Sequence, residues 1–220
     1  MSILRVGTRP SPLAIKQADE LKKLFPWVNF EVVIISTLGD KNKITPLPSV
    51  EGSDFFTREI DQALLEREID IALHSSKDLP DKLNDGLRVV LETKSISPFD
   101  VLASKGKLKL KDLPYASRVG TSSRRRKDQI RALRQDLMIV DVRGNIGERL
   151  ALIDAGKIDA LVVAHAAIIR LGLEHMISEV FNGDNFTAHP KQGSLTLVSR
   201  EDKWQEVKSI LSAQAPVIGN

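Results

Sequence analysis

The sequence predicts an α/β protein built from two lobes. Short apolar and β-branched stretches alternate with segments of helical periodicity along most of the 220 residues. The alternation of strands and helices begins anew after a polar crossing near Lys94–Pro98. Two successive series of this kind indicate two sheets, each covered by its own helices. Lobes joined by extended crossings are typical of a two-lobed binding protein that holds its ligand in a cleft between them.

We assign the first lobe to residues 1–94 plus 190–220. Its expected strands are Leu4–Thr8, Phe30–Ser36, Ile69–Leu73, Leu87–Glu92 and Ser194–Ser199. The first helix is expected to open at Ser11-Pro12, because Ser suits the N-cap and Pro the first helical position. Gln17 lies on the inward stripe of this helix. The remaining expected segments are helices at Phe56–Arg67 and Asp202–Ala213 and a mobile loop or lid at Thr37–Asp54.

The second lobe, assigned to residues 95–189, repeats a strand–helix–strand–helix–strand pattern after one leading strand. Its expected strands are Asp100–Ser104, Ser117–Gly120, Leu137–Val142 and Ile158–Ala164. Its expected helices are Ser122–Arg134, Asn145–Ala155 and Ala166–Leu171. This βαβαβ order predicts a second, parallel sheet.

Composition excludes several kinds of protein and of site. Hydrophobic residues (42%) and charged residues (28%) occur in the proportions of an ordinary globular chain. We expect a cytoplasmic protein without a membrane partner, because no apolar run is long enough to cross a bilayer and the N-terminus lacks a signal-peptide pattern. With no cysteine, disulfides, thiolate catalysis and zinc–cysteine sites are excluded, and the four histidines lack the close pairing of a metal site.

The stretch Ile69–Pro80 (IDIALHSSKDLP) begins as a buried strand and becomes polar at His74. Hydroxyl side chains, Lys77 and Asp78 then follow without a break. The carboxyl end of a strand is where an open α/β sheet presents its ligand groups. A solvated loop after a core strand is the alternative, since Asp and Pro are ordinary turn residues.

Arginines recur where predicted strands end and helices begin. Arg9 follows the first strand, Arg124–Arg126 open a helix after Gly120, and Arg143 and Arg149 flank another helix start. Helix N-termini bind anions, and the guanidinium fork grips carboxylate or phosphate at two points. With a net charge of only +3, this placement indicates an anionic small ligand rather than nucleic acid. No phosphate-binding G-x-x-x-x-G-K-[ST] motif is present, so a nucleotide is less favoured.

Helical spacing separates the arginines of the Ser122–Arg134 segment. Arg126 shares a side with Ile130 and Leu133, the expected buried stripe, and should reach under the helix start. Arg125 lies about 100° from each neighbour, so spacing leaves its direction open. The expected solvated stripe comprises Arg124, Lys127, Arg131 and Arg134.

Five motifs occur in order along most of the chain. They are T-R-P-S-P-L-A at 8–14, H-S-S-K-D-L-P at 74–80, V-G-T-S-S-R-R-R at 119–126, R-G-N-I-G-E-R-L at 143–150 and R-L-G-L at 170–173. Together they resemble the porphobilinogen deaminase (hydroxymethylbilane synthase) family. The resemblance implies two lobes like type II periplasmic-binding-protein domains. It also implies a cytoplasmic, monomeric enzyme of tetrapyrrole (haem) biosynthesis that joins four porphobilinogen units head to tail and releases ammonia each time.

The resemblance also implies roles for individual residues. Asp78 takes the position of the catalytic carboxylate, which hydrogen-bonds pyrrole N–H groups, helps to protonate the departing amine and stabilises the azafulvenium cation that follows. The partners would be porphobilinogen and linear oligopyrroles, whose acetate and propionate groups explain the arginines. The implied substrate- or cofactor-binding residues are Arg9, Ser11, Ser75, Lys77, Thr121, Ser122, Ser123, Arg125, Arg126, Arg143, Asn145, Arg149, Arg170 and Gln192.

The chain departs from the family pattern in its cofactor anchor. The family starts synthesis on a dipyrromethane primer bound to a cysteine in a third, C-terminal α+β domain. This sequence has no cysteine and resembles shortened members of the kind found in chlamydia-related bacteria, so we expect dipyrromethane to be non-covalent or absent. The stretch 47–56 is also poor in lysine, and Leu38 stands where an arginine is common.

Two functions follow from these features. The first is an enzyme that polymerises porphobilinogen, because Asp78 and the arginines match the family. The second is a non-catalytic protein that binds tetrapyrrole or porphobilinogen, because the covalent primer site is missing. The effector lobe of a transcription regulator shares this architecture, but no helix-turn-helix segment precedes the first predicted strand.

Overall fold

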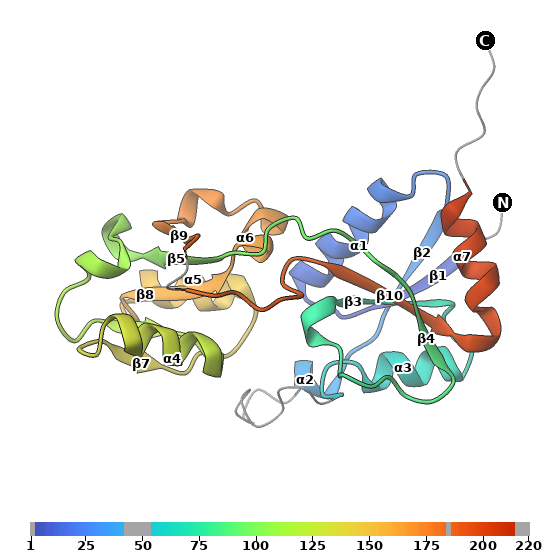
Figure 1. Cartoon of the computed structure of the whole chain (residues 1–220), viewed down its shortest axis with the longest axis horizontal. Coiled ribbons are helices and arrows are strands. Elements are labelled where there is room, and N and C mark those ends of the chain that lie inside the picture. Colours follow the sequence, from blue (N-terminus) through green and yellow to red (C-terminus); the bar gives the residue numbers. More distant parts are fainter. Residues whose placement is uncertain (1–2, 42–53, 184–185, 214–220) are drawn as a thin grey trace, which may run out of the picture. The chain divides into compact units, whose positions relative to one another are not determined.

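The computed structural model describes residues 3–41, 54–183 and 186–213 (Figure 1). They form two compact units, which are described separately. Unit 1 comprises residues 3–41, 54–94 and 194–213, and unit 2 comprises residues 95–183 and 186–193. The chain therefore passes from unit 1 to unit 2 after Lys94 and returns after Gly193.

Unit 1 contains a mixed sheet of five strands in the order β2-β1-β3-β10-β4, counted over the described residues. Strand β1 runs parallel to β2 and β3, whereas β10 runs antiparallel to β3 and β4. The strands are β1 (Ile3–Thr8), β2 (Asn29–Ile34), β3 (Ile71–Ser75), β4 (Leu87–Glu92) and β10 (Leu195–Arg200). All five lie where the sequence predicts strands. The predicted end of β3 is wrong, because His74 and Ser75 pair with Thr196 and Leu195 of β10 and so belong to the strand.

Helices cover both faces of the first sheet (Figure 1). Leu21 of α1 (Pro12–Leu24) and Val207 of α7 (Trp204–Ser212) pack in one core cluster, which covers one face. Helix α3 (Arg58–Leu65) packs with Ala72 and Val198 in another cluster on the other face. The helix start predicted at Ser11 is confirmed, since its Oγ accepts a hydrogen bond from the Ala14 N–H at 3.2 Å.

The segment predicted to form a mobile loop or lid, Thr37–Asp54, begins with a short helix, α2 (Leu38–Lys41). Residues 42–53 of this segment lie outside the described residues. After β3 the chain forms a single 3₁₀ turn, η2 (Ser76–Asp78), and η6 (Glu201–Lys203) precedes α7.

Unit 2 also contains five strands in its described part, in the order β7-β6-β8-β5-β9. They are β5 (Asp100–Ser104), β6 (Arg118–Gly120), β7 (Met138–Val140), β8 (Ala160–Ala164) and β9 (Glu179–Phe181). The prediction of parallel strands is confirmed for the βαβαβ series, because β6 runs parallel to β7 and β8. The sheet as a whole is mixed rather than parallel, since the leading strand β5 runs antiparallel to β8 and β9. Both β5 and β8 are buried on both faces. The sequence of such a short apolar strand does not indicate whether it runs parallel or antiparallel to its neighbours. Strand β9 was not predicted, since three residues are too few to show a period.

Helix α4 covers one face of the second sheet, and α5 and α6 cover the other. Ile130 of α4 (Arg124–Leu133) joins the cluster around Val119 and Val162, whereas α5 (Ile146–Asp154) and α6 (His165–Leu171) join the cluster around Leu161. Three 3₁₀ turns complete the elements of the unit, η3 (Lys105–Lys107), η4 (Leu110–Asp112) and η5 (Glu174–Met176).

Three predictions for the surface of α4 are wrong. Leu133, placed by spacing on the buried stripe, is the last residue of the helix and is 41% exposed. Arg134, placed on the solvated stripe, is half-buried at the C-cap, where it donates to the carbonyls of Leu110, Lys111 and Leu113 at 2.9 Å. Lys127 is also largely covered, with its side chain 16% exposed in an ion pair to Asp141.

The return from unit 2 requires glycine at position 193. Gly193 has a φ of +88°, and a Cβ there would lie 2.4 Å from the Ser97 carbonyl oxygen. We expect Gly193→Ala to lower the free energy of unfolding by about 2–5 kcal/mol, through left-handed strain and overpacking together. Gly156→Ala is the matched control, because its φ is +63° but no described atom lies within 4 Å of an added Cβ. Gly156→Ala should lower the free energy of unfolding, measured by urea titration, by only about 1–2 kcal/mol. Equal losses in the two variants would show that the close approach of Ser97 to Gly193 adds nothing to the cost.

Candidate functional site

A pocket of about 50 Å³ lies at the carboxyl end of β1 and β3 in unit 1. Two parallel neighbouring strands end there, which is the expected position for ligand groups in an α/β sheet. The pocket is lined by Thr8, Arg9, Ser11, Leu13, Ala14, Gln17, Phe56, Leu73, His74, Ser75 and Asp78. Four predicted site residues (Arg9, Ser11, Ser75 and Asp78) are therefore brought together, although they come from separate parts of the sequence.

Asp78 reaches this pocket from a turn that is fixed on its inner side. The turn η2 follows β3 directly, and its first residue, Ser76, is fully buried. The Ser76 N–H donates to the Ser194 carbonyl at 3.1 Å, and the Thr196 hydroxyl donates to the Ser76 Oγ at 2.7 Å. Asp78 and its neighbour Lys77 are both half-buried. The carboxylate is thus presented by a rigid element, as a catalytic group requires.

Arg9 is held in place by an acidic and an aromatic neighbour. Its Nε lies 3.1 Å from Asp40 Oδ1, and its guanidinium carbon lies 4.3 Å from the centre of the Phe56 ring. Burial would raise the pKa of Asp40, but hydrogen bonds and the charge of Arg9 outweigh it and hold this pKa below its ordinary value. Neither Asp40 nor Phe56 was predicted to be a site residue. From the sequence, Asp40 is expected in the loop Thr37–Asp54 and Phe56 at the start of the next helix.

Gln17 is a second pocket residue that was not predicted to be part of the site. Its Nε2 donates to Ser75 Oγ at 2.8 Å, and it is 5% exposed. The available signal was its place on the inward stripe of the first helix, because a buried amide needs a polar partner. Ser11 uses its Oγ to cap α1, so this hydroxyl fixes the pocket wall as well as lining it.

His74, one of the residues that line the pocket, faces a buried carboxyl group. His74 Nε2 lies 3.8 Å from Asp61 Oδ1 of α3, and neither atom has a hydrogen-bond partner in the described part of the chain. The other carboxyl oxygen of Asp61 accepts from Asn84 at 3.0 Å. Burial raises the pKa of Asp61 to about 7. Burial, aided by the charge of Arg9, lowers the pKa of His74 to about 4, so both groups favour their neutral forms.

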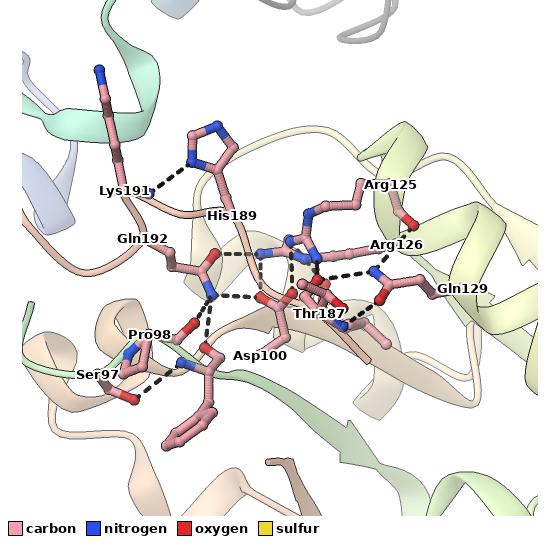
Figure 2. A network of polar contacts seen from close by, with 12 residues as sticks. Ser97, Pro98, Asp100, Arg125, Arg126, Gln129, Thr187, His189, Lys191 and Gln192 are labelled. Atoms are coloured by element: carbon pink, nitrogen blue, oxygen red, sulfur yellow. Dashed lines mark hydrogen bonds and ion pairs between the residues drawn. The ribbon is translucent and has the colours of Figure 1, made fainter. Parts of the chain in front are cut away.

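In unit 2, the predicted site residues Arg125 and Arg126 converge on Asp100 (Figure 2). Arg125 Nη2 lies 2.8 Å from Asp100 Oδ2, and Arg126 Nη2 lies 2.7 Å from Asp100 Oδ1. The predicted burial of Arg126 is confirmed, since it is 8% exposed, and Arg125, left open by spacing, turns to the same carboxylate. Asp100 itself is fully buried and was not predicted to be a site residue. An acidic residue at the start of an apolar strand does not by itself indicate a buried ion pair.

Gln192 completes this cluster (Figure 2). Its Nε2 donates to Asp100 Oδ1 at 2.9 Å and to the carbonyls of Pro98 and Phe99 at 3.0 and 2.8 Å. Its Oε1 accepts from Arg126 Nη2 at 3.3 Å. Gln129 of α4 holds both backbone groups of Thr187, whose carbonyl also accepts from Arg125. The segment 187–192 is therefore tied to the start of α4 and to β5.

Three further predicted residues, Thr121, Ser122 and Ser123, lie in the turn between β6 and α4. Ser122 joins this turn to the one after β7, because its hydroxyl donates to the Val142 carbonyl at 2.5 Å and accepts from the Val142 N–H at 3.0 Å. Thr121 is buried, and its Oγ1 has no hydrogen-bond partner among the described residues. Ser123 stands at the N-cap of α4 without a capping bond from its side chain, so the first N–H groups of this helix are not capped by it.

Three predicted arginines occupy different elements of unit 2. Arg143 follows β7 and is half-buried, and burial lowers the pKa of its guanidinium. Arg149 donates from Nε to the Gly144 carbonyl at 2.8 Å, beside Asn145, which caps α5 through a capping box with Glu148. Arg170 of α6 donates to the Gly193 carbonyl at 2.9 Å. The structure thus brings Arg9, Ser11, Ser75 and Asp78 together in unit 1, and Arg125, Arg126 and Gln192 together in unit 2.

The described residues offer neither a metal site nor a membrane-spanning helix. They contain no group of three or more His, Cys, Asp or Glu side chains able to hold a metal ion. They also include no helix with the length and apolar character needed to span a membrane.

The sequence matches a known protein family over most of its length. Residues 4–208 match the family model described as porphobilinogen deaminase, dipyromethane cofactor binding domain. The chain belongs to the porphobilinogen deaminase family. It is 39% identical to the porphobilinogen deaminase of Ehrlichia canis, over 94% of this chain and 71% of that protein. It is 42% identical to that of Thermus thermophilus, over 91% of this chain and 66% of that protein. The predicted membership of this family is therefore confirmed.

Solved structures confirm the predicted fold class. A nutrient binding protein from Burkholderia cenocepacia bound to methionine has a TM-score of 0.55 at 13% identity, and covers 97% of this chain and 92% of its own. A periplasmic substrate-binding protein of an ABC transporter from Coxiella burnetii has a TM-score of 0.52 at 14% identity, and covers 96% and 92%. The chain therefore has the two-lobed α/β fold of type II periplasmic binding proteins, with a mixed sheet in each lobe.

The Asp61–His74 pair predicts a distinctive dependence of stability on pH. From about pH 4 to 6.5 the folded pair holds its proton on Asp61, whereas the unfolded pair holds one on His74. Because the folded and unfolded pairs bind the same number of protons, the wild-type pair makes the free energy of unfolding neither rise nor fall with pH in this range. In Asp61→Asn only His74 remains, and since its pKa is lower in the folded state, stability should fall as the pH falls from 6.5 to 4.

His74→Gln should show the opposite slope. Asp61 then remains with a pKa raised to about 7, so the stability it contributes is present below pH 4 and is lost as the pH rises to 7. Urea unfolding of both variants and the wild type across pH 4–7 measures these slopes. Curves parallel to the wild type in both variants would show that the two groups do not titrate as described.

Proposed function

We propose that this protein is a porphobilinogen deaminase that condenses porphobilinogen units with release of ammonia. The observation that carries the proposal is the position of Asp78, whose carboxylate lines the pocket of unit 1 on a turn fixed by Ser194 and Thr196. This residue lies in the H-S-S-K-D-L-P motif at 74–80, which resembles the catalytic motif of the family. Membership of the family supports the same reaction.

In this proposal Asp78 acts as the general acid. It would give a proton to the aminomethyl nitrogen as the carbon–nitrogen bond breaks, so that ammonia departs, and its carboxylate would then stabilise the cation left on the pyrrole. Lys77 and Arg9 would attract the acetate and propionate groups of the substrate. The arginines of unit 2 would bind the carboxylates that accumulate as the chain grows, namely Arg125, Arg126, Arg143, Arg149 and Arg170.

We further propose that dipyrromethane is held without a covalent bond. A thioether to this chain is excluded, because the sequence contains no cysteine. A dipyrromethane made of two porphobilinogen units carries several carboxylates, and the guanidinium groups and uncapped helix start of α4 suit them. Arg125, Arg126, Thr121 and Ser123 would hold it. When bound, it would supply the pyrrole end to which units are added.

The second candidate function is a binding protein that lacks catalysis. It is favoured by the missing cysteine, because the family anchors its primer on that residue. Such a protein would bind porphobilinogen or linear oligopyrroles and release no ammonia. Asp78 separates the two functions, since only the enzyme uses its proton.

The test is Asp78→Asn, assayed for ammonia release from porphobilinogen and for binding by calorimetry. We expect turnover to fall by about 10²–10⁴-fold, because the general acid is lost, while porphobilinogen affinity is largely kept. Asp81→Asn is the matched control, since Asp81 is exposed three residues later in the same segment, and it should retain turnover. The proposal fails if the wild type, given preformed dipyrromethane, releases no ammonia. Binding without ammonia release would then favour the second function.

A further inference from the structure

Asp100 is a fully buried carboxylate that the family motifs do not include. It begins β5, where Arg125 and Arg126 each approach one of its oxygens, at 2.8 and 2.7 Å. A buried charge is stable only when it is paired and hydrogen-bonded. Burial would raise the pKa of Asp100, but the charges and hydrogen bonds of Arg126 and Arg125 hold it below the ordinary value, so the group is ionised at neutral pH.

The geometry of α4 explains why two arginines need this carboxylate. Consecutive residues on a helix point about 100° apart, so Arg125 and Arg126 would normally diverge. Their like charges would also repel each other in a half-buried place. Asp100 overcomes both effects, because each guanidinium is drawn to a different oxygen of the same carboxylate.

Gln192 holds the Asp100 carboxylate in place by a hydrogen bond. Its amide donates to Asp100 Oδ1 and to two carbonyls just before β5, and its oxygen accepts from Arg126. Figure 2 shows Gln192 and the two arginines gathered on different sides of the carboxylate. The cluster of two guanidiniums and one carboxylate keeps one net positive charge. Arg125 is the more accessible of the two arginines, with its side chain 27% exposed against 10% for Arg126.

We propose that Asp100 is a positioning residue that converges Arg125 and Arg126, so that they present one net positive charge to a carboxylate of the ligand. This role rests on the proposed function, in which the two arginines bind pyrrole carboxylates. Asp100 itself does not touch the ligand. It acts by fixing the guanidinium of Arg125, whose outer edge is accessible, against the buried guanidinium of Arg126.

The experiment compares Asp100→Asn with Asp159→Asn in the full chain. Asp159 is the control, because it also pairs with an arginine of unit 2, Arg118, at 3.0 Å, but is partly exposed and belongs to no predicted site. In Asp100→Asn we expect the KM for porphobilinogen to rise roughly ten- to hundredfold, with kcat changed less than threefold. Asp159→Asn should leave both constants near the wild-type values.

A second measurement reports the arginine geometry without activity. Phenylglyoxal reacts with accessible guanidinium groups, and peptide mass spectrometry gives the rate at each arginine. Asp100→Asn should accelerate labelling of Arg125 severalfold, and Asp159→Asn should accelerate labelling of Arg118 instead. If Asp100→Asn does not fold, Asp100→Glu keeps the charge while moving it by one methylene. Arg125 should then stay slow to label, and the KM should rise by less than the roughly tenfold expected when the charge is lost.

The outcomes separate this inference from the proposed function. An unchanged labelling rate of Arg125 in Asp100→Asn would overturn the positioning role, as would equal kinetic effects in the Asp100 and Asp159 variants. If the wild type neither binds nor consumes porphobilinogen, the proposed function is lost. Faster labelling of Arg125 in Asp100→Asn would still support its convergence on Asp100.

Discussion

The structure of unit 2 depends on the buried ion cluster around Asp100. One carboxylate with no exposure holds two consecutive arginines, and Gln192 links it to the segment that leads back to unit 1. Removing one partner from such a cluster leaves an uncompensated buried charge, which typically costs about 3–5 kcal/mol. The same contacts therefore stabilise the unit and set the direction of its cationic side chains.

The pocket of unit 1 follows a similar principle with different partners. Arg9 is held by Asp40 and Phe56, Ser75 by Gln17, and the turn that carries Asp78 by contacts to β10 and its preceding residue. Polar groups held in this way need little rearrangement when a ligand binds, which lowers the entropic cost of binding. In both units, residues outside the family motifs hold the residues inside them.

Much of this organisation could be predicted from the sequence, because it is local. Helical spacing placed Gln17 and Arg126 on buried stripes, and the Ser11-Pro12 pair marked the start of α1. The antiparallel direction of β5 could not be predicted, since an apolar strand of five residues has no direction in its pattern. Asp100 and the Asp61–His74 pair were missed because their partners are distant in sequence, and only the folded sheet brings them together.

We propose that this chain, which contains no cysteine, holds an oligopyrrole primer through its cationic groups by non-covalent contacts alone. The most direct measurement is the intact mass of the protein under native conditions, beside its mass after denaturation, following incubation with porphobilinogen. We expect a dipyrromethane increment in the native mass that disappears on denaturation. Identical masses in the two conditions, or an increment that survives denaturation, would contradict it.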